Sequence, residues 1–169
     1  MITEKTEFIL KEGYGSKYLH LGMGVHRLMK EFNPPQEKRR ASLRRVYWLF
    51  HSRGFDCIIS AHTKRLLSIF FYARGCDGHS GAKARTLSGV TFGDAASKVR
   101  RIYGHPSKSA GGFTTQTGDY VRAWYSYRTG IGFHFGRHDN VEIISIFRPS
   151  NVAARRRDRP TLGRVSNRR

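Results

Sequence analysis

Apolar and polar residues alternate most regularly toward the C-terminal end of the chain. Every second residue from Val121 to Tyr127 is Val, Ala or Tyr, and Ile131, Phe133 and Phe135 alternate with Gly132 and His134. A period of two is typical of a β-strand with one buried face. With the apolar run at 141–147, the pattern predicts three strands, and the short turns between them predict antiparallel neighbours. Runs of strand type, separated by turns, predict further strands at 46–50, 55–59 and 65–72, and Phe8-Ile9-Leu10 could be a short lead strand.

Two other stretches follow the period of a helix. Residues 95–103 are predicted as a helix, with Asp94 as N-cap and with Gly104 and Pro106 marking its end. Its apolar face consists of Ala95, Ala96, Val99, Ile102 and Tyr103. A second helix is predicted over 24–32, where Asn33-Pro34-Pro35 follows. Its inner face consists of Val25, Leu28, Met29 and Phe32.

The two helical stretches also resemble each other, which suggests an internal duplication. Gly22 matches Gly93 and Pro35 matches Pro106 at an offset of 71, and three apolar positions between them match at the same offset. Downstream, Trp48 matches Trp124 at an offset of 76. We therefore expect an α+β fold of two tandem repeats, each a helix followed by an antiparallel meander. The two sheets should lie side by side with both helices packed on one face. The predicted parts are a first repeat over 1–75, a glycine-rich linker over 76–86, a second repeat over 87–150 and an arginine-rich tail over 151–169.

The strongly basic charge of the chain adds a functional prediction to this fold, namely an anionic partner. The 169 residues include 31 Lys and Arg against 12 Asp and Glu, which gives a formal net charge of +19. The excess is densest in residues 151–169, which hold seven arginines and one aspartate. Such a balance suits nucleic acid or an acidic protein surface, although a general effect on solubility is the plainer alternative.

The order of residues around the second helix resembles a known group of proteins. Gly89-Val90-Thr91-Phe92-Gly93-Asp94, then a helix, Tyr103-Gly104-His105-Pro106 and a meander are similar to the repeat of the β-lactamase inhibitory protein and of the SmpA/OmlA lipoproteins. The resemblance covers about residues 18–72 and 87–149 and implies a non-catalytic binding module with a concave sheet face. The chain departs from that group in its basic charge, its arginine-rich tail and the lack of an export signal or a lipid-attachment cysteine near its start. The envelope location and the β-lactamase target are therefore not carried over.

Catalytic and metal-binding motifs give weaker signals. Cys76-x-x-His79 is half of a zinc pattern without a clear second half, and the eight histidines include no His-x-x-x-His pair. Gly13-Tyr14-Gly15 and Gly22-Met23-Gly24 are better explained as turn glycines than as a dinucleotide fingerprint. We expect no enzyme activity, no metal, no cofactor and no small-molecule substrate. A Ser or Cys nucleophile stays open, because a catalytic triad is defined by geometry and not by order in the sequence.

Location is predicted as cytoplasmic, unless the given N-terminus is a processed one. The acidic residues near Met1 do not suit a signal peptide, and the apolar run from Leu66 to Tyr72 is too short to span a bilayer. Cys57 is expected in a strand and Cys76 in a loop, and nothing in their spacing demands a disulfide.

The predicted nucleic-acid-binding residues fall in a connection after the first helix and in the tail. They are Lys38, Arg39, Arg40, Arg44, Arg45, Arg155, Arg156, Arg157, Arg159, Arg164, Arg168 and Arg169. The first hypothesis is a non-enzymatic module that binds nucleic-acid backbone, with RNA favoured over DNA, as a component of a ribonucleoprotein. The alternative is an inhibitor or immunity-type module that uses its sheet face against an acidic protein.

Overall fold

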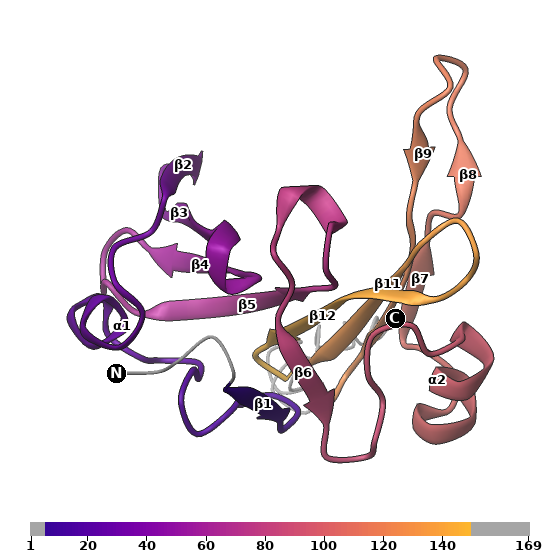
Figure 1. The fold of residues 1–169 in the computed structure, drawn as a ribbon, viewed down its shortest axis with the longest axis horizontal. Helices are drawn as coiled ribbons and strands as arrows, with labels where there is room; N and C mark the ends of the chain where they lie inside the picture. Colours follow the sequence, from indigo (N-terminus) through magenta and orange to yellow (C-terminus); the bar gives the residue numbers. More distant parts are fainter. Residues whose placement is uncertain (1–5, 150–169) are drawn as a thin grey trace, which may run out of the picture.

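The computed structural model describes residues 6–149, and its main element is one eight-stranded antiparallel sheet (Figure 1). Across the sheet the strands follow the order β2-β3-β4-β5-β12-β11-β10-β7. The first four are β2 (Glu37–Ser42), β3 (Arg45–Phe50), β4 (Phe55–Ser60) and β5 (Leu66–Tyr72). The others are β12 (Val141–Phe147), β11 (Ile131–Phe135), β10 (Ala123–Tyr127) and β7 (Lys108–Ala110). The two halves meet where β5 pairs with β12, with Ile69 opposite Ile146 and Phe71 opposite Ile144.

Smaller elements surround this sheet. The helices α1 (Val25–Phe32) and α2 (Ala96–Tyr103) have eight residues each, and no helix in residues 6–149 is long and apolar enough to cross a membrane. A parallel pair joins β1 (Glu7–Leu10) to β6 (Lys83–Thr86), and two 3-10 turns occur at η1 (His51–Arg53) and η2 (Cys76–Gly78). The hairpin of β8 (Phe113–Thr114) and β9 (Tyr120–Val121) projects away from the sheet (Figure 1).

The predicted fold class is wrong. The chain is mostly β, and eight of its strands form one large antiparallel sheet in place of the sheets of two helix-plus-meander repeats. The physical reason is the pairing of β5 with β12, which we call the seam. Two separate sheets would leave the apolar edge strands β5 and β12 with unpaired backbone groups. Pairing them satisfies both edges and extends one sheet through the molecule.

The hydrophobic core lies on one face of the sheet, where the β1–β6 pair adds to the cover given by the helices. Phe8 of β1 contacts Phe55 and Phe71 of the sheet, with ring centroids 6.2 and 5.1 Å apart. Leu28 and Val99, from α1 and α2, are fully buried in the same cluster. The fully buried sheet residues include Phe50, Phe55, Ile69, Phe71, Ile131, Phe133, Phe135, Ile144 and Ile146.

Most predicted strands and both helices are present, with differences at particular residues. The connection over 36–45 contains strand β2, which its polar sequence did not indicate. Ala95, not Asp94, is the N-cap of α2, because the Asp94 carboxylate instead accepts bonds from the Thr91 amide and the Lys98 ammonium. The segment predicted as a glycine-rich linker contains η2 and β6.

Two glycines allow parts of the chain to approach closely. Gly54 has φ of 72°, and a Cβ there would lie 2.2 Å from the amide nitrogen of Ala82. Gly130 has φ of 93°, and a Cβ there would lie 2.3 Å from the carbonyl oxygen of Phe147. Both turns therefore require a residue that tolerates a left-handed backbone and has no side chain.

Candidate functional site

The five cations predicted in the first half lie on the hairpin that forms one edge of the sheet. Lys38, Arg39 and Arg40 belong to the edge strand β2, Arg44 lies in the turn, and Arg45 begins β3. All five are exposed. The structure therefore brings these residues together on one antiparallel hairpin.

The hairpin alternates its cations between the two faces of the sheet. Lys38 lies opposite Trp48 and places its ammonium 4.6 Å from the centre of that ring, which is a cation–π contact. Arg39 lies opposite Tyr47 and donates two hydrogen bonds to the carboxylate of Glu37. The bond to Arg39 lowers the pKa of Glu37, so this pair stays charged.

Besides Lys38, which lies over the Trp48 ring, three cations of the hairpin have no carboxylate partner in residues 6–149. No ion pair between Arg40, Arg44 or Arg45 and an acid occurs in this part of the chain. These three guanidinium groups can therefore contact an external anion without first breaking an internal salt bridge.

A second turn adds two cations that sequence reasoning missed. The amide of Ala61 donates to the carbonyl of Arg44 at 2.9 Å, so the turn between β4 and β5 lies beside the turn between β2 and β3. That second turn carries Lys64 and Arg65, both exposed. The signal was present in the sequence, because turns two hairpins apart in a meander lie at the same end of the sheet.

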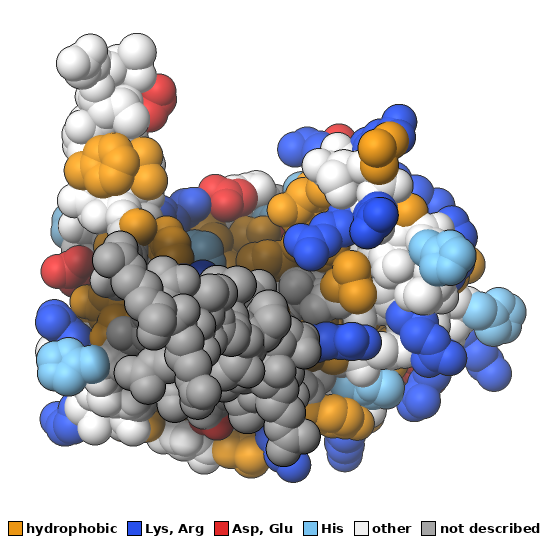
Figure 2. All heavy atoms as spheres, turned by 180° about the vertical axis from the view of Figure 1, so that it is seen from behind, with side chains coloured by type: hydrophobic (Ala, Val, Ile, Leu, Met, Phe, Trp, Pro, Cys, Tyr) orange, Lys and Arg blue, Asp and Glu red, His pale blue; other side chains and the backbone are white. Residues whose placement is uncertain are grey.

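We call these seven residues the basic end: Lys38, Arg39, Arg40, Arg44, Arg45, Lys64 and Arg65. Glu37 is the only acidic residue within the ranges 37–45 and 61–65. Figure 2 shows blue side chains gathered on the half of the molecule that includes this hairpin. The result is a strongly positive surface at one end of the sheet.

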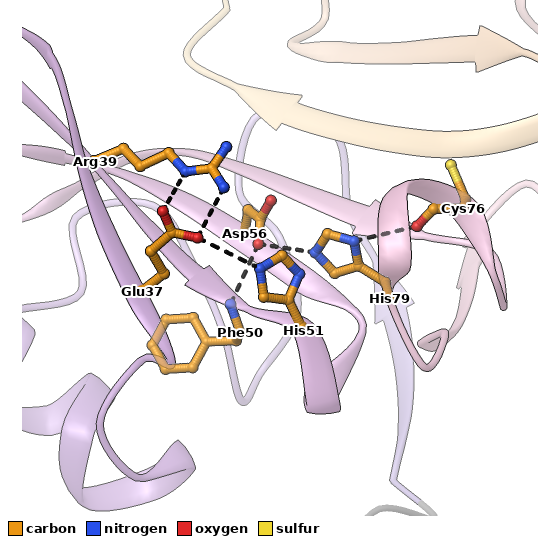
Figure 3. Close-up of polar contacts among 7 residues, drawn as sticks. All are labelled: Glu37, Arg39, Phe50, His51, Asp56, Cys76 and His79. Atoms are coloured by element: carbon orange, nitrogen blue, oxygen red, sulfur yellow. Dashed lines mark hydrogen bonds and ion pairs between the residues drawn. The ribbon is translucent and has the colours of Figure 1, made fainter.

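A polar cluster adjoins the hairpin on the face of the sheet away from the core (Figure 3). Asp56 on β4 is 6% exposed, and its Oδ1 accepts bonds from the Phe50 amide at 3.2 Å and from His79 Nε2 at 2.9 Å. The imidazole of His79 stacks on Tyr72 with ring centroids 3.8 Å apart. His51 lies 4.6 Å from His79, measured between ring centroids, and its Nε2 is 4.0 Å from a carboxylate oxygen of Glu37.

Both ring nitrogens of His79 are occupied. Nδ1 faces the backbone oxygen of Cys76 at 3.2 Å, while Nε2 faces the Asp56 carboxylate. Because both partners are acceptors, they favour the protonated imidazolium form of His79. Burial alone would lower the pKa of His79. The hydrogen bond to Asp56 and the negative charge of the Asp56 carboxylate outweigh this effect, so the pKa of His79 is raised. His79 is thus suited to fasten the η2 loop to the sheet, and it has no free nitrogen for a metal or for a substrate proton.

The half zinc pattern therefore does not form a metal site with its two residues. His79 contacts the backbone of Cys76, and Figure 3 shows the Cys76 sulfur directed away from the imidazole. No group of three or more metal-ligating side chains occurs among the described residues. Both cysteines are free, and burial raises the pKa of Cys57 strongly and that of Cys76 to about 11. Neither thiol is therefore poised as a thiolate at neutral pH.

The seven predicted tail arginines lie outside the described residues. They are Arg155, Arg156, Arg157, Arg159, Arg164, Arg168 and Arg169. Their predicted part in binding stays a prediction.

Comparisons with known proteins give a fold likeness and no family. No family model matches the chain, and no curated protein matches it in sequence. An extracellular protein containing an SCP domain from Bacillus anthracis str. Ames has a similar structure, with a TM-score of 0.51 and 6% identity. The match covers 88% of this chain and 50% of that protein, so the chain spans about half the length of this neighbour.

Two further structures are more distant. A DUF4309 family protein from Bacillus subtilis has a TM-score of 0.48 at 15% identity, and the match covers 80% of this chain and 88% of that one. A cysteine-rich secretory protein from Staphylococcus aureus has a TM-score of 0.49 at 10% identity, with coverages of 86% and 48%. None of the three is a β-lactamase inhibitory protein or an SmpA/OmlA lipoprotein, so that resemblance stays a prediction.

Proposed function

We propose that the protein is a non-enzymatic module that binds the sugar-phosphate backbone of nucleic acid through the basic end. The observation that carries this proposal is the convergence of two turns, from different hairpins, that together hold four cations: Arg44, Arg45, Lys64 and Arg65. A backbone hydrogen bond between the turns fixes their spacing. An array of guanidinium and ammonium groups at fixed spacing suits successive phosphates.

The charges on β2 also have a simpler role. Lysine and arginine on an edge strand prevent the strand from pairing with another sheet edge. That role accounts for Lys38, Arg39 and Arg40, which lie on the edge strand itself. It does not account for Lys64 and Arg65, because β4 and β5 are interior strands of the sheet. The turn cations therefore favour binding over edge protection alone.

The direct test is the salt dependence of binding to a 20-nucleotide oligouridine and to duplex DNA of the same length. Removing one cation that binds a phosphate should reduce the slope of log affinity against log salt by about 0.7 on the single strand and about 0.9 on the duplex. Changing Arg44, Arg45, Lys64 and Arg65 to Gln should therefore reduce the slope by about 3 units if every one of them binds a phosphate. Deleting residues 151–169 tests the tail separately.

A matched control removes the same charge elsewhere. Its four exposed cations, changed to Gln together, are Arg101, Lys108, Arg128 and Arg137. This control should keep most of the slope if the basic end is the site. Equal reductions in both variants would show that binding depends on net charge alone, and an unchanged slope in the turn variant would contradict the proposal. Sequence preference should be weak, because backbone contacts carry no base information.

A second candidate function, binding to a protein, is favoured by the projecting hairpin. Phe113 on β8 lies directly opposite Val121 on β9, and these side chains are 54% and 37% exposed. Figure 2 shows hydrophobic side chains on this arm, away from the body of the molecule. Nuclease-resistant capture of one acidic protein, abolished when Phe113 is changed to Ser, would support this candidate in place of nucleic-acid binding.

A further inference from the structure

The turn that joins β2 to β3 carries a serine motif that backbone binding does not explain. Ser42 ends β2, Arg39 and Arg40 precede it by three and two residues, and Leu43 follows it. Arginines at these two positions and an apolar residue directly after the serine form the pattern selected by serine/threonine kinases that have an acidic substrate groove. Such a short pattern is common by chance, so its surroundings in the fold decide whether a kinase can use it.

Leu43 is the residue that the other roles of this hairpin leave unexplained. Its side chain is 83% exposed, the highest value among the large exposed hydrophobic residues of the described chain. Tight turns between strands favour Gly, Asn and Asp, and protection of a sheet edge needs charge. Leucine in this place serves neither purpose, but it suits an apolar kinase pocket for the residue after the serine.

The hydroxyl of Ser42 is accessible. Ser42 is exposed, and its Oγ accepts a hydrogen bond from the Arg44 amide at 3.3 Å but donates none within residues 6–149. Because β2 is the edge strand, no other strand of the sheet pairs with its outer side. Arg39 would have to leave Glu37, and this exposed ion pair is of the kind that contributes little to stability. A kinase can therefore approach the motif from the outer side.

We propose that Ser42 is a phosphorylation site for a serine/threonine kinase of this basic-directed class, and that phosphate there weakens nucleic-acid binding at the basic end. In the reaction the Ser42 Oγ attacks the γ-phosphorus of ATP. The Oγ–P bond forms as the bond from that phosphorus to the bridging oxygen of ADP breaks, and the hydroxyl proton passes to the catalytic aspartate of the kinase. The modification is independent of the proposed function, whereas its effect on binding rests on that function.

A phosphate on Ser42 would lie among the cations of the basic end. Arg45 lies directly opposite Ser42 across the hairpin, at a spacing where side chains interact, and the Arg44 amide already contacts the Ser42 Oγ. Phosphoserine carries a charge of about −1.5 to −2 near neutral pH and offers three strong acceptor oxygens. The guanidinium groups of Arg44 and Arg45 would bind this phosphate, which leaves two fewer cations for nucleic acid.

The modification is tested on the folded full chain with ATP, Mg²⁺ and the catalytic subunit of cyclic-AMP-dependent protein kinase, a basic-directed enzyme. Peptide mass spectrometry should find one phosphate at Ser42. Changing Arg39 and Arg40 to Gln should lower the initial rate at Ser42 at least tenfold. The matched control, in which Arg101 and Lys108 are changed to Gln, should leave that rate unchanged.

A second serine and a peptide provide internal comparisons. Ser88 is also exposed and follows Arg85 by three residues, but Arg85 bonds Glu7 and the residue after Ser88 is Gly89. Ser88 should therefore react at least tenfold more slowly than Ser42. A synthetic peptide of residues 36–46 reports the activity of the kinase on the motif outside the fold. Modification of the peptide but not of the folded chain, or a rate at Ser88 equal to that at Ser42, would overturn the inference.

The effect on binding is measured by comparing oligouridine affinity before and after phosphorylation. If Arg44 and Arg45 bind the phosphoserine, the slope of log affinity against log salt should fall by about 1.4, or about 0.7 for each cation. Affinity should fall at least tenfold at low salt, and Ser42→Ala carried through the same kinase reaction should keep the slope of the unmodified chain.

Two outcomes separate this inference from the proposed function. Unchanged oligouridine binding after complete phosphorylation of Ser42 would overturn the regulatory effect. An unmodified chain that does not bind oligouridine would contradict the proposed function instead, and mass spectrometry would still decide whether Ser42 is the modification site.

Discussion

The two halves of the sheet have similar inner strands but differ at their outer hairpins. In the first half, β2 and β3 are joined by a tight turn, and β2 runs for six residues at the sheet edge. In the second half, the edge strand β7 has three residues, and the chain leaves the sheet to form the β8–β9 arm before it returns as β10. One outer hairpin carries exposed cations, and the other carries an exposed Phe–Val pair.

This difference shows which parts of the chain the core constrains. The inner strands β4, β5, β11 and β12 hold most of the fully buried side chains, so their sequences are restricted by packing. The outer hairpins bury little and can carry charge or exposed apolar residues at small cost to stability. Function is therefore expected at the outer hairpins and loops, and stability at the seam.

The largest expected effect comes from truncating the core in either half. Phe71→Ala and Phe133→Ala remove fully buried rings and should each lower the free energy of unfolding by about 3–5 kcal/mol. Trp124→Ala, which lies on the opposite face and is only half-buried, should cost clearly less. Urea unfolding measures all three, and a destabilisation by Trp124→Ala equal to that by Phe133→Ala would show that the second face is packed like the core.

The next largest effect is expected from breaking the buried ion pair between His79 and Asp56. His79→Gln leaves the Asp56 carboxylate without its cation and should cost about 3 kcal/mol at pH 6. Because the folded state raises the pKa of His79, the contribution is fully present below the ordinary value of about 6.5. It is lost as the pH rises through the raised value.

The measurement is the difference in unfolding free energy between wild type and His79→Gln at pH 6 and pH 9. This difference should shrink at the higher pH. A difference that grows with pH would mean that His79 is neutral in the folded protein at pH 6. Groups that do not interact with His79 contribute equally to both chains and cancel.

Gly54 and Gly130 test whether each half of the sheet depends on a turn packed closely against another segment of backbone. Gly54→Ala and Gly130→Ala should each cost about 2 kcal/mol, since the new Cβ meets backbone atoms at a positive φ. Gly118→Ala is the matched control, because it also has positive φ but has open space around it. Thermal unfolding should show the smallest destabilisation for Gly118→Ala. Equal destabilisation in all three variants would mean that the positive φ, and not the close backbone contact, causes the loss of stability.

The smallest effect concerns a link between the halves. Arg122 bonds Glu142 on β12 at 2.7 Å and Asp77 in η2 at 3.1 Å, so it ties a loop of the first half to the second. Arg122→Gln should cost less than about 1 kcal/mol, as is usual for surface pairs. Hydrogen exchange should nevertheless increase locally in η2, and unchanged exchange there would show that His79 alone holds the loop.

The sequence predicted local structure better than the arrangement of the sheet. The period of two located β10 and β11, runs of apolar residues located β4 and β12, and Asn33 and Gly104 marked the helix ends. The single sheet could not be predicted, since nothing local in β5 or β12 shows that each is the other's neighbour. Strand β2 was missed because an edge strand with charged residues on both faces has no alternation to detect.

The candidate site could be predicted only in part for the same reason. Runs of arginine are visible locally, so Arg39, Arg40, Arg44 and Arg45 were found. Lys64 and Arg65 reach the same surface through the pairing of four strands, and Asp56 meets His79 through the fold of the η2 loop. Such proximity depends on long-range geometry, which a single sequence does not display.

The seam between β5 and β12 has a consequence for how the chain reaches its native state. Its paired residues, such as Ile69 and Ile146, are more than 70 positions apart along the chain. Contacts of such high sequence separation require the loop-closure entropy to be lost before they form, which makes them late and rate-limiting. We therefore expect slow refolding, in the millisecond-to-second range typical of domains with high contact order. Until the seam closes, two apolar strand edges stay open, and protein concentration should then decide between refolding and aggregation.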